Sequence, residues 1–341
     1  MLKLRRGVVV EVDPLTIEVE GERRRAWADE RLLGRMLAGD EVVVNTEALD
    51  LDLGSGGFDI VHVNLTRGLE GAGAGGAHVI KLNYSSLQHP VEPVERRGGE
   101  VDRDRPPEIP VLVIPLHGHL APAAWAAGQA RPGLRVGYVQ TGGGALPGGI
   151  SRDVAQLRGL GILCGHVTAA PAYGGELEAL SVAGALDAAA HGLGWDAAIA
   201  GAGPGIIGSE TLLGHGGMAA LDTAHAALAL GMRTLVSPRL SEGDPRPRHQ
   251  GLSHHTRTVL DLLLGDVVVP LPGGMREDEL TGLLPARHRA SPQQIDLDAY
   301  EASGLPTRVM GRALEDDRLF FAAPLASGRA LAEAAAGVGG E

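Results

Sequence analysis

The pattern of apolar and polar positions changes at about residue 110. Before it, short β-branched runs at residues 7–12, 16–20 and 41–45 are separated by turn residues. Several short strands at this spacing are typical of a small barrel or a curled sheet. Residues 1–85 are therefore predicted to form a β-rich, barrel-like module, followed by a polar connector at residues 86–109 that is rich in Pro, Glu and Arg.

From residue 110 onward, continuous apolar runs alternate with helical patterns. The apolar runs lie at 111–114, 135–139, 162–168, 197–200, 233–236 and 266–269. The helical patterns lie at 121–130, 151–159, 176–191, 211–230 and 254–264, and the C-terminal stretch is expected to add a strand or two and an Ala-rich helix. Such alternation indicates a mostly parallel sheet with helices on both faces. Residues 110–341 are therefore predicted to form a Rossmann-like α/β domain.

Histidines and glycines follow two of the predicted strands. Leu116-His117-Gly118-His119 follows the first strand, and Gly201-Ala202-Gly203-Pro204-Gly205 follows the strand at 197–200. Ligands of open α/β sheets bind beyond the carboxyl ends of the strands. If the first segment is extended, its two imidazoles share one face. The glycines can let backbone N–H groups surround an anion, although a tight strand-to-helix turn explains them equally well.

The densest group of polar side chains lies at residues 239–255, RLSEGDPRPRHQGLSHH. A loop this long inside a compact domain is usually functional or disordered, and its His and Arg content favours a function. Ser253 is predicted to cap a helix that begins with His254 and His255. The positive end of the helix dipole disfavours charged imidazole there, and a neutral imidazole can bind a metal or act as a general base.

These segments supply the candidate site residues. The predicted catalytic side chains are His249, His254, His255 and Asp244. The residues predicted to hold an anionic ligand or cofactor are Gly201, Gly203, Gly205, Arg246 and Arg248, because guanidinium groups suit carboxylate and phosphate. The candidate metal ligands are His117 and His119.

We expect five of these histidines to converge on one cavity with the 201–205 turn, namely His117, His119, His249, His254 and His255. The alternative is that each histidine packs and hydrogen-bonds locally, with the arginines on a solvated loop face paired to Asp244. His215 and Glu210 could also contribute to a zinc or iron site, but the spacing matches no named metal signature. A divalent metal is therefore a hypothesis, and the cofactor stays unidentified.

Composition narrows the classes of partner. With 42 acidic and 30 basic residues the chain carries a formal net charge of −12, which argues against non-specific nucleic-acid binding. The single cysteine, Cys164, excludes an intrachain disulfide and a Cys-based zinc site. No apolar run reaches the roughly 20 residues that cross a bilayer, and no signal-peptide pattern is present. A cytoplasmic protein without a membrane partner is expected.

A homodimer is also expected. Symmetric dimers are the commonest soluble oligomers. The helical pattern at 211–230 carries only Asp222 as a charged residue when its histidines are neutral. Such a surface is either interior or interface.

Several segments carry a resemblance to a known family. They are KLNYSSLQ at 81–88, PLHGH at 115–119, GPGIIG at 203–208, RHQGLSHHT at 248–256 and MGR at 310–312. Together they resemble a family of uncharacterised bacterial proteins catalogued only as a domain of unknown function. The resemblance spans nearly the whole chain and implies a common architecture, but no activity, substrate or cofactor. The chain departs from the family at SETLL, residues 209–213, where a segment containing Thr and Lys is expected, so no role for Glu210 follows.

The sequence favours binding of a small anionic molecule and leaves open whether the protein is an enzyme. One interpretation is a hydrolase or transferase with a pocket lined by His and Arg. The other is a non-enzymatic ligand-sensing or scaffold protein whose β-module contacts a partner.

Overall fold

The computed structural model describes residues 1–341 except 54, 72, 74, 98–107, 275–283 and 338–341. It contains two compact units, Met1–Val91 and Glu92–Glu341. The first unit extends beyond residue 85 because it includes the hairpin of β6 (Val79–Lys81) and β7 (His89–Val91). The second begins within the predicted connector, where the short helix η2 (Val94–Arg96) contributes the buried Val94 to its core. Residues 98–107 of that connector lie outside the described residues.

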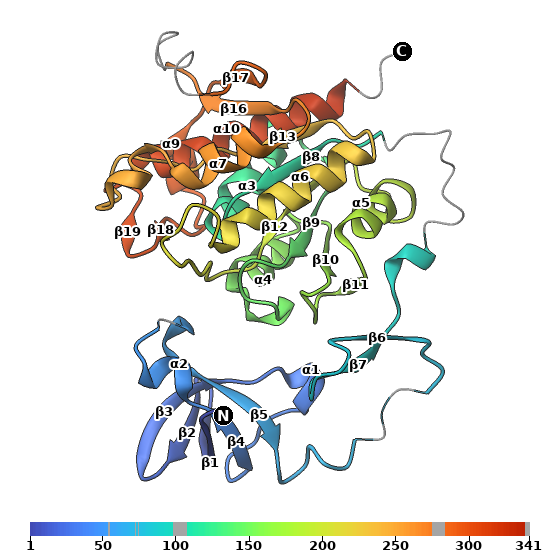
Figure 1. The fold of residues 1–341 in the computed structure, drawn as a ribbon, viewed down its shortest axis with the longest axis vertical. Coiled ribbons are helices and arrows are strands. Elements are labelled where there is room, and N and C mark those ends of the chain that lie inside the picture. Colours follow the sequence, from blue (N-terminus) through green and yellow to red (C-terminus); the bar gives the residue numbers. More distant parts are fainter. Residues whose placement is uncertain (54, 72, 74, 98–107, 275–283, 338–341) are drawn as a thin grey trace. The chain divides into compact units, whose positions relative to one another are not determined.

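The first unit contains a closed barrel of five strands in the order β1-β2-β3-β5-β4 (Figure 1). The strands are β1 (Leu4–Val12), β2 (Leu15–Val19), β3 (Glu22–Trp27), β4 (Glu41–Asn45) and β5 (Asp59–Asn64), with the short helices α1 (Glu30–Leu33) and α2 (Glu47–Asp50) and the turn η1 (Ser55–Gly57) between them. Alternate side chains such as Val9, Ile17 and Val42 point inward and are at most 1% exposed. The predicted barrel-like module is confirmed.

The second unit contains an eight-stranded sheet in the order β11-β10-β9-β12-β8-β13-β16-β17. The strands are β8 (Val111–Ile114), β9 (Val136–Thr141), β10 (Gly165–Ala169), β11 (Leu177–Ala179), β12 (Ala197–Ala202), β13 (Thr234–Val236), β16 (Val268–Pro272) and β17 (Arg289–Gln293). Each neighbouring pair is parallel. The predicted parallel α/β domain is confirmed.

Helices cover both faces of this sheet, as Figure 1 shows. Alternate residues of β8 belong to two different cores: Val111 and Val113 to one, Leu112 and Ile114 to the other. The first core includes α5 (Val182–His191), α6 (Ala219–Ala229) and α7 (His254–Leu262). The second includes α3 (Leu120–Ala130), α4 (Arg152–Gly159), α9 (Leu297–Glu301) and most of α10 (Arg318–Ala336). Burial on both faces explains why the strands are continuous apolar runs. Within the described ranges, no helix combines the length and apolar character that crossing a bilayer requires.

The order of the strands defines where a site can form. From β8 the chain moves past the position of β12 to β9, β10 and β11 at one edge. It then returns to insert β12 beside β8, crosses to β13 on the other side of β8, and continues to β16 and β17. The reversal of direction around β8 makes a topological switch point, and ligands of open α/β sheets bind at such a point.

Three local predictions are wrong. The helix predicted at 176–191 begins only at Val182, because Leu177–Ala179 pair with β10 as strand β11. The other two concern the segments that follow β12 and β8. The helix predicted at 211–230 begins later, with the short turn η5 (Gly216–Met218) and then α6. The segment before it contains glycines at 214, 216 and 217, which disfavour helix. In addition, residues 117–119 form the 3₁₀ turn η3 rather than an extended segment, so the rings of His117 and His119 do not share a face.

Candidate functional site

A cavity of about 560 Å³ lies around the loops that follow β8, β12 and β13. Its charged lining residues are Asp153, Glu210, Arg239, Arg246, Arg248 and Arg308. Its histidines are His117, His215, His249, His254 and His255. Four guanidinium groups thus face two carboxylates, and the lining is positive overall although the chain as a whole is acidic.

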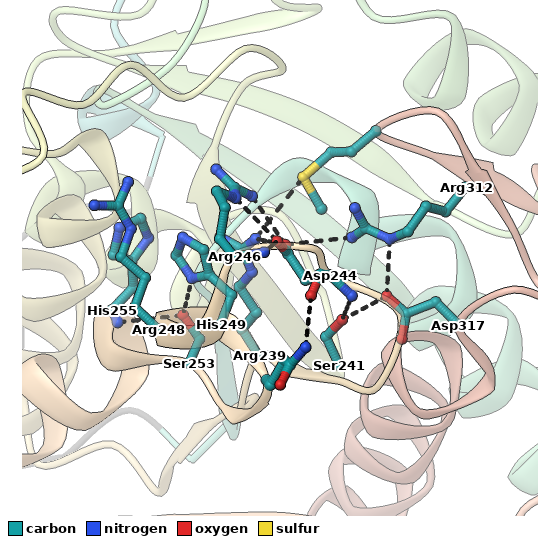
Figure 2. A network of polar contacts seen from close by, with 12 residues as sticks. Arg239, Ser241, Asp244, Arg246, Arg248, His249, Ser253, His255, Arg312 and Asp317 are labelled. Atoms are coloured by element: carbon teal, nitrogen blue, oxygen red, sulfur yellow. Dashed lines mark hydrogen bonds and ion pairs between the residues drawn. The ribbon is translucent and has the colours of Figure 1, made fainter.

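The segment 239–255 folds back on itself and presents its arginine and histidine side chains to this cavity. Strands β14 (Leu240–Ser241) and β15 (Gly251–Leu252) pair antiparallel, and the short turn η6 (Pro247–His249) lies between them. Asp244 lies inside this excursion and its carboxylate is fully buried (Figure 2). The long loop predicted from the sequence is therefore an ordered hairpin built around one carboxylate.

The carboxylate of Asp244 accepts hydrogen bonds from two arginines. Its Oδ1 accepts from the backbone N–H and the Nε of Arg246, at 3.0 and 2.9 Å. Its Oδ2 accepts from Nη2 of Arg246 at 2.8 Å and from Nη2 of Arg239 at 3.0 Å. A third guanidinium, that of Arg312, has Nη2 3.5 Å from Oδ2 and donates through Nε to Asp317 at 3.0 Å. Figure 2 shows the three arginines gathered around the one carboxylate.

These contacts keep Asp244 ionised. Burial acts to raise the pKa of this carboxyl, but the hydrogen bonds from Arg246 and the charges of Arg246 and Arg239 outweigh burial and lower it below its usual range. Asp244 is not among the cavity-lining residues. The structure therefore places this predicted catalytic residue behind the cavity, where it orients guanidinium groups.

Arg239 has an N–H group without a partner. The side chain lines the cavity and is 6% exposed. Within the described residues, no acceptor lies within hydrogen-bonding distance of its buried Nε. Burial, together with the neighbouring Arg246 and Arg312, lowers its pKa to about 10, so it remains charged at neutral pH. A buried polar group without a partner costs about 1–3 kcal/mol, and more when the group is charged. This cost is recovered when an acceptor binds.

Four histidines lie together at one part of the cavity wall, and we call His215, His249, His254 and His255 the histidine cluster. The rings of His215 and His255 stack, with centroids 3.6 Å apart and planes at 9°. The ring of His254 lies 4.3 Å from that of His255 and 4.9 Å from that of His249. The four rings come from the loop before η5, the turn η6 and the first turn of α7.

Hydrogen bonds fix some of the ring nitrogens and leave others without partners. Nε2 of His215 lies 3.1 Å from the carbonyl oxygen of Leu212, which can only accept, so Nε2 carries the hydrogen and Nδ1 of the neutral ring has a free lone pair. Nδ1 of His249 hydrogen-bonds with Oγ of Ser253 at 2.7 Å. That same Oγ caps α7, as predicted, by accepting from the backbone N–H of His255 at 3.3 Å.

Three nitrogens of the cluster are buried and have no hydrogen-bond partner in the described part of the chain. They are Nδ1 of His215 and Nε2 of both His249 and His254. Burial lowers the pKa of all four imidazoles, to about 3 in His249 and about 2 in His255, and the charge of Arg239 adds to this effect. The rings are therefore neutral at neutral pH, in the state that binds metals or accepts protons.

His215, His254 and His255 are also close enough together to hold one metal ion. One ring nitrogen from each lies within 4.8 Å of the other two. No other group of three such ligands occurs in the described residues. The candidate pair predicted from the sequence, His117 and His119, is not part of this group.

His117 lines the cavity, but its nitrogens have partners. Nε2 hydrogen-bonds with Oγ of Ser151 at 2.7 Å, and Nδ1 lies 3.4 Å from the hydroxyl of Tyr138. That hydroxyl donates to the backbone carbonyls of Gly201 and Ala202 at 2.9 and 3.0 Å. These contacts fix the imidazole at the end of β8.

His119 lies outside the cavity lining. Its ring is fully buried, and Nδ1 hydrogen-bonds with Oγ of Ser237 at 2.9 Å. The ring packs edge-on against Phe320, with centroids 5.2 Å apart. Of the five histidines predicted to converge, the structure therefore brings together His117, His249, His254 and His255. The 3₁₀ turn η3 directs His119 into the core instead.

The three predicted anion-binding glycines occupy different surroundings. Gly205 lines the cavity with a φ of +75°, in the left-handed region that favours glycine. A Cβ at Gly201 would collide with Ile114 of β8, and one at Gly203 would collide with the carbonyl oxygen of Ala145. The latter two glycines therefore allow close packing of backbone against backbone and do not line the cavity.

Three important lining residues were not assigned to the site from the sequence. The sequence analysis named His215 only as a further possible metal ligand, because the pattern placed it in a predicted helix. Arg239 directly follows the β13 segment, so the rule on strand ends could have found it. Arg308, in β18 (Arg308–Val309), which pairs with β19 (Arg312–Ala313), comes from a remote part of the chain, and no local signal marks it.

Comparisons with known proteins identify the family and no activity. No curated protein and no solved structure gives a significant match. A family model described as "Protein of unknown function (DUF3866)" matches residues 25–328, which include β4, β5 and the end of β3 from the barrel and every residue that lines the cavity. This match agrees with the resemblance seen in the short sequence segments, and the chain therefore belongs to this family of proteins of unknown function.

Proposed function

We propose that the cavity binds a small molecule through a carboxylate or phosphate group, and that the protein is a hydrolase or transferase acting on that molecule. The observation that carries the proposal is Arg239, a charged and buried side chain that lines the cavity and whose Nε–H has no acceptor among the described residues. An anionic oxygen is the acceptor that best satisfies a guanidinium group.

The surrounding charges favour the same ligand class. Arg248 lines the cavity and is 39% exposed, and its Nη2 lies 4.0 Å from the exposed carboxylate of Glu210. Such an exposed pair contributes little, so the Arg248 guanidinium can turn to a ligand at small cost. Arg308 also faces the cavity. An anion of modest size can therefore contact several guanidinium groups at once.

Neutral imidazoles beside these arginines support an enzyme over a sensor. His254 lines the cavity and is partly exposed, and burial together with the charges of nearby arginines lowers its pKa. An imidazole that is neutral at working pH can accept a proton from water or a hydroxyl group during hydrolysis or group transfer. A sensor requires only the arginines. The predicted homodimer and cytoplasmic location stay part of the proposal on the sequence grounds given above, although residues 211–215 of the proposed interface helix are loop.

The test compares Arg248→Gln with Arg257→Gln, a matched change on α7 at an exposed arginine outside the cavity. Calorimetric titration of the full-length protein with inorganic phosphate, acetate and citrate should detect saturable binding. A hydrogen bond to a charged group is worth about 1.5–3 kcal/mol, so Arg248→Gln should weaken Kd by about 10- to 150-fold. Arg257→Gln should leave Kd unchanged. Absence of binding up to millimolar anion, or equal effects of the two changes, would overturn the anion site. Saturable binding of a cellular anion without any turnover would favour the sensor.

A further inference from the structure

The cluster offers three nitrogen ligands from parts of the chain far apart in sequence. His215 comes from the loop before η5, and His254 and His255 from the first turn of α7. One ring nitrogen of each lies within 4.8 Å of the others. In a tetrahedral zinc site, nitrogens at about 2.0–2.1 Å from the ion lie about 3.3 Å apart. The side chains must therefore move for the three nitrogens to close around one ion.

The hydrogen-bond pattern of His215 is the one seen in metal ligands. Its Nε2–H donates to the carbonyl oxygen of Leu212, which fixes the tautomer and leaves the lone pair on Nδ1. Ligating histidines almost always donate their second ring N–H to a carboxylate, carbonyl or water in this way. Nδ1 is buried and has no partner in the described part of the chain, and the same holds for Nε2 of His254. His215 itself is 8% exposed.

The glycine at position 217 keeps a side chain away from the free lone pair of His215. A Cβ at Gly217 would lie 3.0 Å from Nδ1 of His215 and 3.5 Å from Nδ1 of His255. Both nitrogens therefore border the volume that a side chain at position 217 would fill. The stacked rings of His215 and His255 cannot both aim their lone pairs at one point, so binding of an ion requires one ring to tilt out of the stack.

We propose that His215, His254 and His255 bind one divalent transition-metal ion, with a further coordination position open to the cavity. Three neutral imidazoles suit zinc, cobalt, nickel or copper better than magnesium or calcium, which prefer oxygen ligands. Three protein ligands with one open position is the arrangement of catalytic zinc sites. His249 contacts His254 and His255 and supports the cluster from the side of η6.

The charges of the cavity arginines affect how strongly the metal ion binds. Arg239 and Arg248 repel a cation, whereas an anion held between them and the ion is attracted to both. The anion and the metal should therefore strengthen each other's binding by the same factor. This coupling rests on the proposed anion site, but the three-histidine metal site does not.

The experiment uses the full-length protein, stripped with a chelator and dialysed into a buffer free of phosphate and carboxylates. Titration with Co²⁺, followed by its visible absorption, and with Zn²⁺, by competition with a chromophoric chelator, should each give one ion per chain. His254→Gln and His255→Gln should each weaken metal binding by about 100-fold or more, since even partners of ligands cost 10- to 100-fold. His191→Gln, on α5 and paired with Asp187, lies outside the cavity and should have no effect. Circular dichroism establishes that the variants are folded, and two separate ligand variants guard against a folding defect in one.

The outcomes separate the metal site from the anion site. Absence of stoichiometric binding, or binding that neither folded ligand variant weakens, overturns the metal site. Phosphate titrations of the metal-free protein test the anion site by itself, so either proposal can fail while the other stands. Addition of phosphate to the Co²⁺-loaded protein should change the absorption spectrum and increase the affinity for Co²⁺. If phosphate changes neither the absorption spectrum nor the metal affinity, the proposal that a coordination position of the ion is open to the anion is wrong.

Discussion

Replacement of Asp244 by Asn tests whether this carboxylate holds the cavity together. The side chain is fully buried, and its oxygens accept hydrogen bonds from Arg239 and Arg246 with Arg312 close by. Asn has nearly the same shape but no charge, and its amide nitrogen donates. The oxygen of the Asn side chain can still accept a hydrogen bond from Arg246. Its amide N–H group, in contrast, would face the N–H group of Arg239, so two donors would oppose each other there.

The size of the effect depends mainly on Arg239. Removing one partner of a buried ion pair costs about 3–5 kcal/mol because a charge is left buried and uncompensated. Arg239 is 6% exposed, so water can replace little of its contact with Asp244. Arg246 is 48% exposed, so water can replace much of its contact and it adds little. Arg312 keeps Asp317 as a partner. We therefore expect Asp244→Asn to lower the free energy of unfolding by about 3 kcal/mol.

Urea unfolding of the full chain measures this value, with tryptophan fluorescence as one signal and far-ultraviolet circular dichroism as another. Trp125 and Trp195 report on the α/β unit and Trp27 on the barrel. Only the transition of the α/β unit should shift. The matched control is Asp298→Asn, which removes an 88% exposed carboxylate paired with Arg318, and it should cost less than about 1 kcal/mol.

The pH dependence gives a second readout with a defined sign. The pKa of Asp244 is lower in the folded than in the unfolded protein. Its stabilisation is therefore complete above the unfolded pKa of about 3.9 and is lost as the pH falls from there through the folded pKa. The difference between wild type and Asp244→Asn should shrink over that range. If Asp244→Asn instead stays within about 1 kcal/mol of wild type at neutral pH, like the surface control, the role assigned to this carboxylate is wrong.

Two further predictions concern other parts of the structure. Gly203→Ala places a Cβ against the carbonyl oxygen of Ala145 and should lower the free energy of unfolding of the α/β unit by about 1–3 kcal/mol. Gly208→Ala should be nearly neutral, because its Cβ would meet its first neighbour at 3.4 Å. Equal urea midpoints for the two variants would contradict the packing argument. In the barrel, hydrogen bonds from Arg67 lower the pKa of the buried Asp40 to about 2, so the stability that this carboxylate provides should be lost as the pH falls from about 4 towards 2. Hydrogen exchange of barrel peptides in the full chain should reveal that loss, and Asp40→Asn should remove the acid dependence; an unchanged profile in the variant would refute the assignment.

The fold class was predictable because burial leaves a direct mark on sequence. Strands covered on both faces are apolar at every position, as in Val111–Ile114, and barrel strands alternate, as around Val42 and Val44. The start of α6 was not predictable from periodicity. The loop before it is fixed by a contact with a distant loop, because a Cβ at Gly216 would collide with the carbonyl oxygen of Gly143. Local pattern carries no information about such a partner.

The candidate site was predictable where its residues are neighbours in sequence. His249, His254 and His255 share one short segment whose helix cap, Ser253, is visible in the pattern. His215 joins them only because of how η5 packs against α7, and Arg308 joins from the C-terminal region. Asp244 was assigned to catalysis together with the histidines of the same segment, and the alternative was an ion pair with the arginines of that segment. The structure shows that ion pair for Arg246, whereas the contacts of Asp244 with Arg239 and with the distant Arg312 become evident only in the fold.

The charge balance of the cavity connects the anion site with the metal site. Three guanidinium groups surround Asp244, which neutralises one of their positive charges. Asp317 neutralises a second, so one positive charge is left over among these five side chains. Arg248 and Arg308 add two positive charges, the lining carboxylates Asp153 and Glu210 remove as many, and the imidazoles add none because burial keeps them neutral, so one excess positive charge remains. These groups repel a divalent ion, and an anion between them and the ion offsets that repulsion. If both proposals hold, the metal affinity measured without anions should rise with anion concentration until the anion site is saturated.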